Sequence, residues 1–444
     1  MNKEVLKTII LTILVFSSIF LTWSIWSYSP DFDSIDDLDD QTYLKDVSIP
    51  DSTELSTIIK PIQMVYYDEN QHYGSTSEKI IGDMIDEISS WNFEGFQEIS
   101  SNVTRERIQS LITENGMSEF VFSDSVPFSI YNKVLNLSED DDLPEANFDR
   151  ILVEAVRENV EYSPVYFIES GTKRVYRCNV SGVNVQELKK KMLHVREDLV
   201  SYSIVNASSM NYLYVPTDET TVNYYKYYIE PLEVNKFKET LFQDPSEVTQ
   251  EYSASEEEYT DLQSIMRVDN ERLMLSYVNP TRDINYETTS SDLLERSLQY
   301  MNDHDGWDEN YRYVDVDEDT KKTTFRLFVN SMPVFNKSGI SEVTQVWNKD
   351  AIYRYDRPMF SLNLTLPDIQ NATLPSGQYV FEQLKQVDGF EPELLEYLLI
   401  GYKMSRDTEE QRLIILEPTW YYKYDNQWEQ YTVVYSGGID DGLE

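Results

Sequence analysis

Cysteine, histidine and basic residues are scarce in this 444-residue chain. Cys178 is the single cysteine, and His72, His194 and His304 lie far apart in the sequence. One cysteine excludes an internal disulfide framework, and so few nitrogen and sulfur ligands disfavour a zinc site. Neither a P-loop nor a G-x-G-x-x-G dinucleotide motif occurs. We therefore expect no metal and no cofactor.

The charge of the chain is strongly acidic, because 37 lysines and arginines face 79 aspartates and glutamates, a net charge of −42 at pH 7. Such a surface repels nucleic acid and anionic lipid headgroups, so nucleic acid is not expected as a partner. Hydrophobic residues still make up 41% of the chain, and 33 tyrosines are present. This composition supplies ample material for folded cores. The length suggests about two to four domains.

Charged residues are absent from Thr8 through Pro30. At about 1.5 Å per residue, a helix from Thr8 to Tyr28 is about 32 Å long and spans one bilayer core. A cleaved secretory signal has a shorter apolar run and a small-residue cleavage site. The first alanine is Ala146 and the only cysteine lies far downstream, so neither a signal-peptidase site nor a lipoprotein site is present. Residues 1–30 are therefore predicted to be a cytoplasmic tip and an uncleaved transmembrane anchor.

Flanking charge predicts the orientation of this anchor. Lys3 and Lys7 precede it, whereas the next basic residue after it is Lys45. The amino terminus should therefore be cytoplasmic and the bulk of the chain extracytoplasmic. Aromatic residues that favour the headgroup layer gather at the outer end, namely Trp23, Trp26 and Tyr28. The predicted location is the cell membrane, which the chain crosses once.

Residues 31–57 are rich in aspartate and serine and predict an acidic, solvated stalk. A mixed α/β domain is predicted over residues 58–200. Its expected elements are strands over 59–67 and 119–132, helices over about 78–88, 104–116 and 185–199, and a hairpin over 163–180 with its turn at 170–173. The segment 148–156 fits a helix by its spacing and a strand by its β-branched residues, and both remain open.

Aromatic strands dominate the second half, which predicts a central α+β domain over 201–307 and a C-terminal α+β domain over 308–444. Helices are expected around 234–242, 291–300, 378–386 and 391–400. No fixed-period repeat occurs, which disfavours a solenoid. The expected fold class is α+β: a single N-terminal transmembrane helix followed by a multi-domain mixed α/β extracytoplasmic region whose last two domains are similar to each other.

Short patterns typical of penicillin-binding-type acyltransferases also occur. They are the SxxK pattern Ser170 to Lys173, the SxN pattern Ser209 to Asn211 and the KTG-like triplet Lys337 to Gly339. That chemistry needs the serine and the lysine one helical turn apart. Gly171 lies between two strand-like runs, so a hairpin is expected there, and the acyltransferase interpretation is disfavoured.

Three stretches of the sequence resemble the YycH family. They are the opening MNKEVLKTIILTILVFSSIFLTWSIWSYSPDFD, the NSMPVFN stretch at 330–336 and LLIGYKMSRDTEEQRLIILEPTWYYKYDNQWEQY at 398–431. The resemblance runs from end to end and is strongest at the two termini. The GY…LEPTWYY…W pattern near the end is also similar to the partner family YycI.

The resemblance implies a non-enzymatic membrane protein that acts with a YycI-like partner on an essential sensor histidine kinase of the WalK/YycG type. It also implies control of cell-wall metabolism, three outer α/β domains of which the last is YycI-like, and a strand over 148–156. Within the family such proteins restrain or promote kinase output, so the sign of regulation is left open. A ligand- or wall-polymer-binding module is the alternative, although no residue pattern indicates its site.

Two sets of residues are candidate contact sites for such partners. In the anchor, one helical stripe allows close helix packing in lipid, namely Thr8, Thr12, Val15, Ser18, Ile19, Thr22 and Trp26. Hydroxyl groups that bond back to their own helix are the alternative explanation. In the C-terminal strands, four aromatic residues are a candidate outer interface, namely Trp420, Tyr421, Tyr422 and Trp428. The alternative is that such alternating aromatics are half core and half surface.

Overall fold

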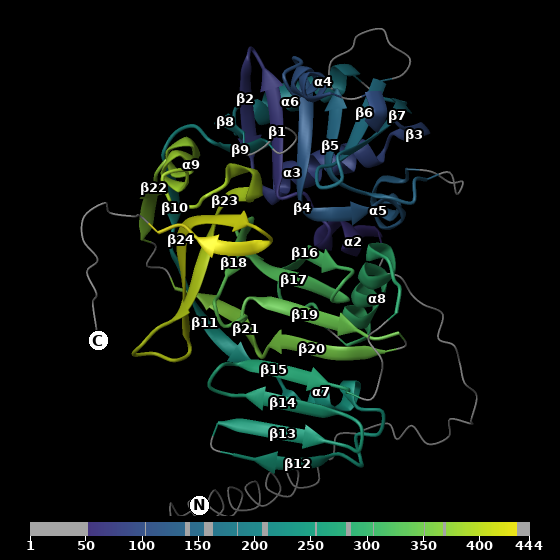
Figure 1. The fold of residues 1–444 in the computed structure, drawn as a ribbon. Helices are drawn as coiled ribbons and strands as arrows, with labels where there is room; N and C mark the ends of the chain where they lie inside the picture. Colours follow the sequence, from purple (N-terminus) through teal and green to yellow (C-terminus); the bar gives the residue numbers. More distant parts are fainter. Residues whose placement is uncertain are drawn as a thin grey trace, which may run out of the picture. The chain divides into compact units, whose positions relative to one another are not determined.

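The computed structural model describes residues 52–102, 104–137, 143–154, 163–183, 185–206, 212–253, 255–280, 286–304, 306–349, 351–366 and 370–432. Across these ranges, short helices alternate with strands that gather into two large sheets (Figure 1). None of the helices in these ranges has the length and apolarity that a membrane span requires, and the predicted anchor lies outside the ranges. The mixed α/β fold class is confirmed for the part of the chain described.

The first sheet is built from residues 63–216. Its described strands are β1 Gln63–Asp68, β2 Gln71–Ser75, β3 Asn92–Glu98, β4 Met117–Pro127, β5 Asn147–Glu154, β6 Ser163–Glu169, β7 Arg174–Ser181, β8 Val200–Asn206 and β9 Tyr212–Pro216. They lie in the order β3-β7-β6-β5-β4-β1-β2-β8-β9, and each neighbouring pair is antiparallel. The helices of this part are α2 Ser52–Ile58, α3 Glu78–Ser89, η1 Ser100–Asn102, α4 Arg105–Ile112, α5 Phe128–Leu135 and α6 Val185–Arg196.

Helices cover both faces of the first sheet. α3, α5 and α6 pack against the face that carries Phe120 and Phe122, whereas α4 packs against the face that carries Val121. Successive strand residues point to opposite faces, which is why these neighbours belong to different cores. Thr104 caps α4, since its side chain accepts a hydrogen bond of 3.3 Å from the Arg107 amide. The predicted start of this helix is therefore confirmed, but the helix ends at Ile112.

The second sheet is built from residues 225–430. Its described strands are β11 Tyr225–Pro231, β12 Thr249–Tyr252, β13 Glu256–Thr260, β14 Ile265–Asp269, β15 Met274–Val278, β16 Tyr311–Asp317, β17 Lys322–Val329, β18 Met332–Phe335, β19 Glu342–Trp347, β20 Ile352–Pro358, β21 Phe360–Thr365, β23 Leu395–Arg406, β24 Leu413–Tyr424 and β25 Gln427–Gln430. A separate pair joins β10 Thr220–Asn223 to β22 Asn371–Leu374. The helices are α7 Val234–Leu241, α8 Ser290–Asp303, α9 Gly377–Leu384 and η2 Pro392–Leu394.

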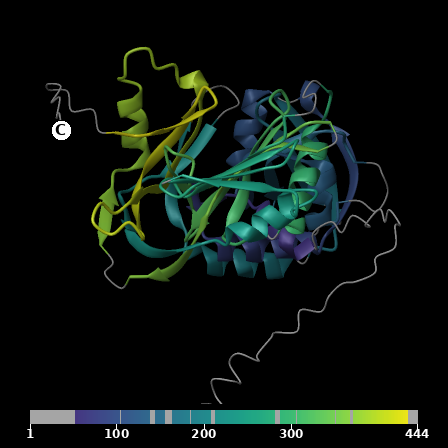
Figure 2. The same cartoon turned by 90° about the horizontal axis from the view of Figure 1, so that it is seen from below.

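The main path of the second sheet runs β12-β13-β14-β15-β20-β19-β17-β18-β23-β24-β11-β21, with β16 paired to β17 and β25 to β24. The sheet crosses the boundary predicted at residue 307, because β15 pairs with β20 and β11 pairs with β24. α7 and α8 lie on the same face of this sheet (Figure 2). They add apolar side chains to its core, such as Phe237 and Leu294. The segments predicted as two domains therefore share one sheet. β9, which the sequence predicts at the start of the central domain, belongs to the first sheet.

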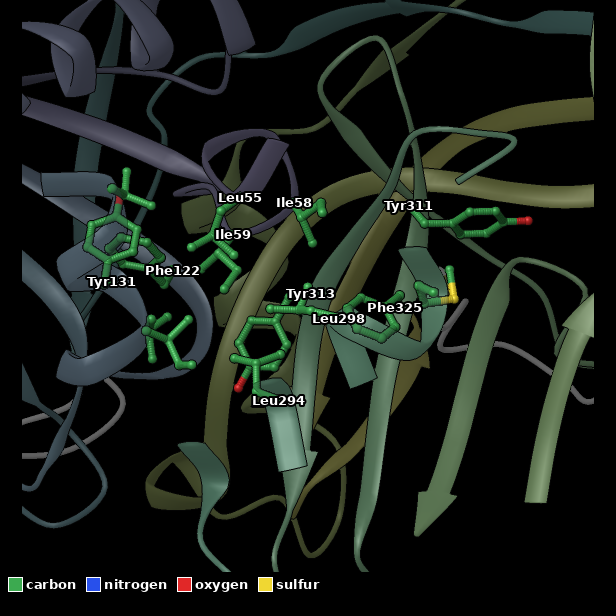
Figure 3. Close-up of a cluster of buried hydrophobic side chains, with 14 of the residues drawn as sticks. Leu55, Ile58, Ile59, Phe122, Tyr131, Leu294, Leu298, Tyr311, Tyr313 and Phe325 are labelled. Carbon is green, nitrogen blue, oxygen red and sulfur yellow. The ribbon is translucent and has the colours of Figure 1, made fainter. Parts of the chain in front are cut away.

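One helix that the sequence did not predict links the cores of the two sheets. α2 lies in the segment predicted as a solvated stalk, yet Leu55 is fully buried and Ile59 is 1% exposed. These side chains lie between Phe122 of the first sheet on one side and Leu294 of α8 and Tyr313 of the second sheet on the other (Figure 3). The stalk prediction is wrong for residues 52–57. The two apolar residues of this seven-residue helix, Leu55 and Ile58, form too short a pattern to indicate helical periodicity in the sequence.

Three further segments can be compared with their predicted secondary structure. Residues 147–154 form β5, as the family resemblance implied. Residues 128–135 form α5 instead of extending the strand that precedes them, because Phe128, Tyr131 and Leu135 make a buried helical face after Pro127. Residues 395–400 belong to β23 and not to a helix. Their three leucines and Glu396 favour a helix intrinsically, but pairing with β24 overrides this propensity.

Candidate functional site

The two sheets meet where β4 lies beside β16. Ser123 donates a hydrogen bond of 2.9 Å to the Tyr313 carbonyl, and the Tyr313 hydroxyl donates one of 2.7 Å to the Ser125 carbonyl. The Val316 amide donates to the Asp124 carboxylate at 3.0 Å. These bonds join backbone and side-chain groups of both strands and fix one sheet against the other.

Tyr397 of β23 reaches the same junction. Its hydroxyl donates a hydrogen bond of 3.0 Å to the Phe122 carbonyl, and its ring stacks on Trp428 with 5.9 Å between ring centroids. Tyr397 and Arg150 line two cavities, a polar cleft of about 1350 Å³ and an apolar pocket of about 270 Å³. The junction therefore borders two spaces of different chemistry.

The polar cleft holds a cluster of charged side chains around Lys423, which is 7% exposed. The Lys423 ammonium lies 3.1 Å from the Glu396 carboxylate and 4.0 Å from that of Asp315. Burial, aided by the negative charge of Asp315, raises the pKa of Asp124 to about 7, whereas the Lys423 charge opposes this rise. Asp124 therefore changes its charge near neutral pH at the point where the sheets meet.

A buried ion pair lies beside this cluster. Arg150 and Glu119 are 4% and 2% exposed, and their side chains are 2.7 Å apart. The hydroxyls of Tyr212 and Tyr214 donate to Glu119 at 3.0 and 2.6 Å, and Arg150 also donates to the Tyr212 carbonyl at 2.9 Å. Tyr212 and Tyr214 belong to β9, which lies four places from β4 in the sheet order. The network therefore bends the end of the first sheet back over β4 and β5.

The apolar pocket lies between the end of the first sheet and the edge of β23. The first sheet contributes Leu213 and Tyr202, and β23 contributes four consecutive residues, 397–400. β18 closes the pocket with Met332 and Pro333. The pocket therefore brings together two of the stretches that carry the family resemblance, NSMPVFN at 330–336 and the start of the 398–431 stretch.

The predicted aromatic interface divides into two parts. Trp420 is 1% exposed and packs in a core with α9 and β9, and Tyr421 is 6% exposed and stacks on Phe335 at 3.9 Å between ring centroids. Tyr422 and Trp428 are partly exposed. The structure thus removes Trp420 and Tyr421 from an exposed interface, because α9 and β9 pack on Trp420 and Phe335 of β18 stacks on Tyr421. An interface role of the other two remains a prediction.

The anchor stripe lies outside the described residues: Thr8, Thr12, Val15, Ser18, Ile19, Thr22 and Trp26. The acyltransferase pattern gains no support from the structure, since Ser170 and Lys173 lie in the turn between β6 and β7 and not on a helix. The Ser170 hydroxyl donates to Asp149 at 2.9 Å and accepts from Arg150 at 3.2 Å. In the part of the chain that is described, no cluster of histidine, cysteine, aspartate and glutamate could hold a metal ion.

Sequence reasoning missed the charged residues of the junction, Asp124, Asp315, Glu119 and Arg150. Pairing of β4 with β5 brings Glu119 and Arg150 together, and contact between β4 and β16 brings Asp124 and Asp315 together. No local pattern in the sequence indicates either contact. One local signal was available for the pocket. Pro333 lies inside a short strand-like run. Because proline has no N–H group to donate, it indicates that the hydrogen bonds to a neighbouring strand end at this point.

The fold and the site define an α+β protein of two sheets joined by an ion-paired junction with an adjoining apolar pocket. Family models described as "YycH protein, N-terminal domain" and "YycH protein, C-terminal domain" match residues 4–196 and 210–438. The chain therefore belongs to the YycH family.

A sequence relative and a solved structure illustrate this similarity. "Two-component system WalR/WalK regulatory protein YycH" of Bacillus subtilis (strain 168) is 24% identical over 443 residues, which cover 96% of this chain and 96% of the relative. A solved structure, "Crystal Structure of YycH from Bacillus subtilis", is similar with a TM-score of 0.72 at 20% identity. The match covers 85% of this chain and 96% of that one, and it shows the same fold.

Proposed function

We propose that this chain is a membrane-anchored, extracytoplasmic accessory protein that modulates a sensor histidine kinase of the WalK/YycG type. Through the kinase it would adjust cell-wall metabolism. Membership of the YycH family over both domains carries this proposal, together with a relative of matching length whose printed name is that of a WalR/WalK regulatory protein. A non-enzymatic role agrees with the junction, whose charged side chains are bonded to one another.

The proposed partners are the kinase and a YycI-like membrane protein. The anchor sequence supports contacts within the membrane, because its stripe of small and hydroxyl side chains allows close helix approach. The outer part offers Tyr422 and Trp428, which are partly exposed on β24 and β25. Partly exposed aromatic residues are enriched in protein interfaces. The proposal therefore includes a transmembrane contact and an outer contact.

Crosslinking in living cells tests the proposal. The native chain and a version whose first 30 residues are replaced by an unrelated anchor would be crosslinked, solubilised and purified side by side. Recovery of a sensor kinase and a YycI-like protein with the native anchor alone would place the contact in the transmembrane helix. Recovery with both versions would place it in the outer domains. Recovery with neither would contradict the proposal.

Two double variants test the transmembrane stripe itself. Thr12→Leu with Thr22→Leu changes the stripe, whereas Ser17→Leu with Ser24→Leu changes hydroxyl residues off it. We expect the first pair to lower crosslinking to the kinase and the second to leave it unchanged. Unchanged crosslinking with the first pair would rule out the stripe as the contact and would leave the outer domains as the candidate.

A further inference from the structure

The edge of β23 that faces the apolar pocket is free of any described strand. The register of β23 with β24 determines which backbone groups of β23 bond to β24 and which point to the opposite edge. The Asp407 amide, just after β23, donates to the Leu413 carbonyl of β24 at 2.9 Å, so residue 407 faces β24. Strand residues alternate in the side to which their backbone groups point, so odd-numbered residues of β23 face β24. Leu398 and Ile400 therefore point their N–H and C=O groups away from β24, toward the pocket they line.

β18 occupies the continuation of this same edge and then stops. It pairs in parallel with β23 at Val334 and Tyr402, where Gly401 permits close approach, since a Cβ there would lie 2.8 Å from the Pro333 carbonyl oxygen. The next residue of β18 along the ladder is Pro333, which has no N–H to donate to the Ile400 carbonyl. Proline therefore ends the ladder where the pocket begins.

The surroundings of this free edge indicate what would bind there. The walls are mostly apolar, with Val222, Leu213 and Met332 among the lining side chains. Arg150 also lines the pocket, but its charge is paired with Glu119 at 2.7 Å. The exposed charged side chain that lines the pocket is Asp198, a carboxylate. A complementary ligand thus has backbone groups that pair with an edge, apolar side chains and a positive charge.

We propose that the free edge at Leu398 and Ile400 binds an extended peptide segment of a partner protein, with apolar side chains at alternate positions and a lysine or arginine that meets Asp198. The bound segment continues the line of β18 and pairs with β23, while its side chains fill the apolar pocket. An extended peptide fits better than an acyl chain, because an acyl chain leaves the backbone groups of the edge unpaired. This inference goes beyond the proposed function and does not rest on the kinase being the partner.

The test uses the full-length protein in lipid nanodiscs and a fluorescein-labelled probe peptide, Lys-Val-Thr-Val-Thr-Val-Lys, whose binding is followed by fluorescence anisotropy. Two further probes carry a single N-methyl group, on the central valine or on the threonine before it. Only one of these two amides can face β23 in a paired strand. We expect one N-methyl probe to bind about tenfold more weakly or worse and the other to bind within about twofold of the parent. Equal binding of both, or displacement by decanoate alone, would overturn the proposal.

A matched pair of variants places the binding in the pocket. Thr220→Trp fills the pocket from β10, whereas Thr221→Trp changes the adjacent exposed residue, which does not line it. We expect Thr220→Trp to weaken binding of the parent probe about tenfold and Thr221→Trp to leave it unchanged. Asp198→Asn should weaken it several-fold at low salt only. Equal binding by the Thr220→Trp and Thr221→Trp proteins would overturn the site assignment.

Discussion

Glu119→Gln is expected to destabilise the protein strongly, although the substitution is nearly isosteric. It removes the charge that Arg150 faces at 2.7 Å, and both side chains are less than 5% exposed. Leaving one partner of a buried ion pair uncompensated costs about 3–5 kcal/mol. Tyr212 and Tyr214 donate to different oxygens of the Glu119 carboxylate, and the glutamine keeps only one acceptor oxygen. The loss therefore includes one tyrosine hydrogen bond in addition to the unpaired guanidinium.

The measurement is urea unfolding of the full-length protein in nanodiscs, followed by tryptophan fluorescence. Glu258→Gln is the matched control, because Glu258 pairs with Arg267 at 2.8 Å on an exposed surface, where such a pair contributes about 0–1 kcal/mol. The double variant Glu119→Gln with Arg150→Met removes both buried charges and should recover part of the loss. If Glu119→Gln cost no more than Glu258→Gln, the buried network would not hold β9 in place.

Three further predictions concern the junction and the core. The pKa of Asp124 is about 7 in the folded protein and about 3.9 in the unfolded chain. Between these pH values the folded state binds more protons than the unfolded state, so the free energy of unfolding falls as pH rises from about 4 to 7. Asp124→Asn should therefore reduce the loss of melting temperature between pH 5.5 and pH 8, and an unchanged loss would contradict the assignment. Tyr397→Phe removes the bond to the Phe122 carbonyl and should lower the free energy of unfolding by about 1 kcal/mol, without change in m-value. Cys178 is 1% exposed and burial raises its pKa, so iodoacetamide should label it only after unfolding, and rapid labelling of the native protein would refute this.

Local sequence patterns predicted the elements whose burial follows a simple period. Ile81, Met84, Ile85 and Ile88 gave the helical spacing of α3, and Gly171 in its turn gave the β6–β7 hairpin. The sequence also supported the α+β class, since helical and aromatic strand segments alternate along the second half. Predictions failed where pairing decides the structure. The leucine-rich segment at 395–400 favours a helix by itself, but β24 supplies a long partner strand.

The candidate site was harder to predict than the fold. Asp124 and Asp315 are far apart in the chain, and their cluster exists only because β4 meets β16. Trp420 appeared as an interface candidate because aromatic residues favour interfaces, but α9 and β9 cover it. Whether an alternating aromatic residue faces a core or solvent depends on which elements pack on its sheet, and no local pattern determines this.

The most direct test of the account measures the phosphorylated fraction of the response regulator that the sensor kinase serves. Cells lacking this chain would be compared with cells that express it in full and with cells that express a form whose anchor is exchanged for an unrelated one. The account predicts that loss of the chain changes this fraction, in either direction, and that the full chain restores it. An identical fraction in the presence and absence of the chain would contradict a role in regulating the kinase.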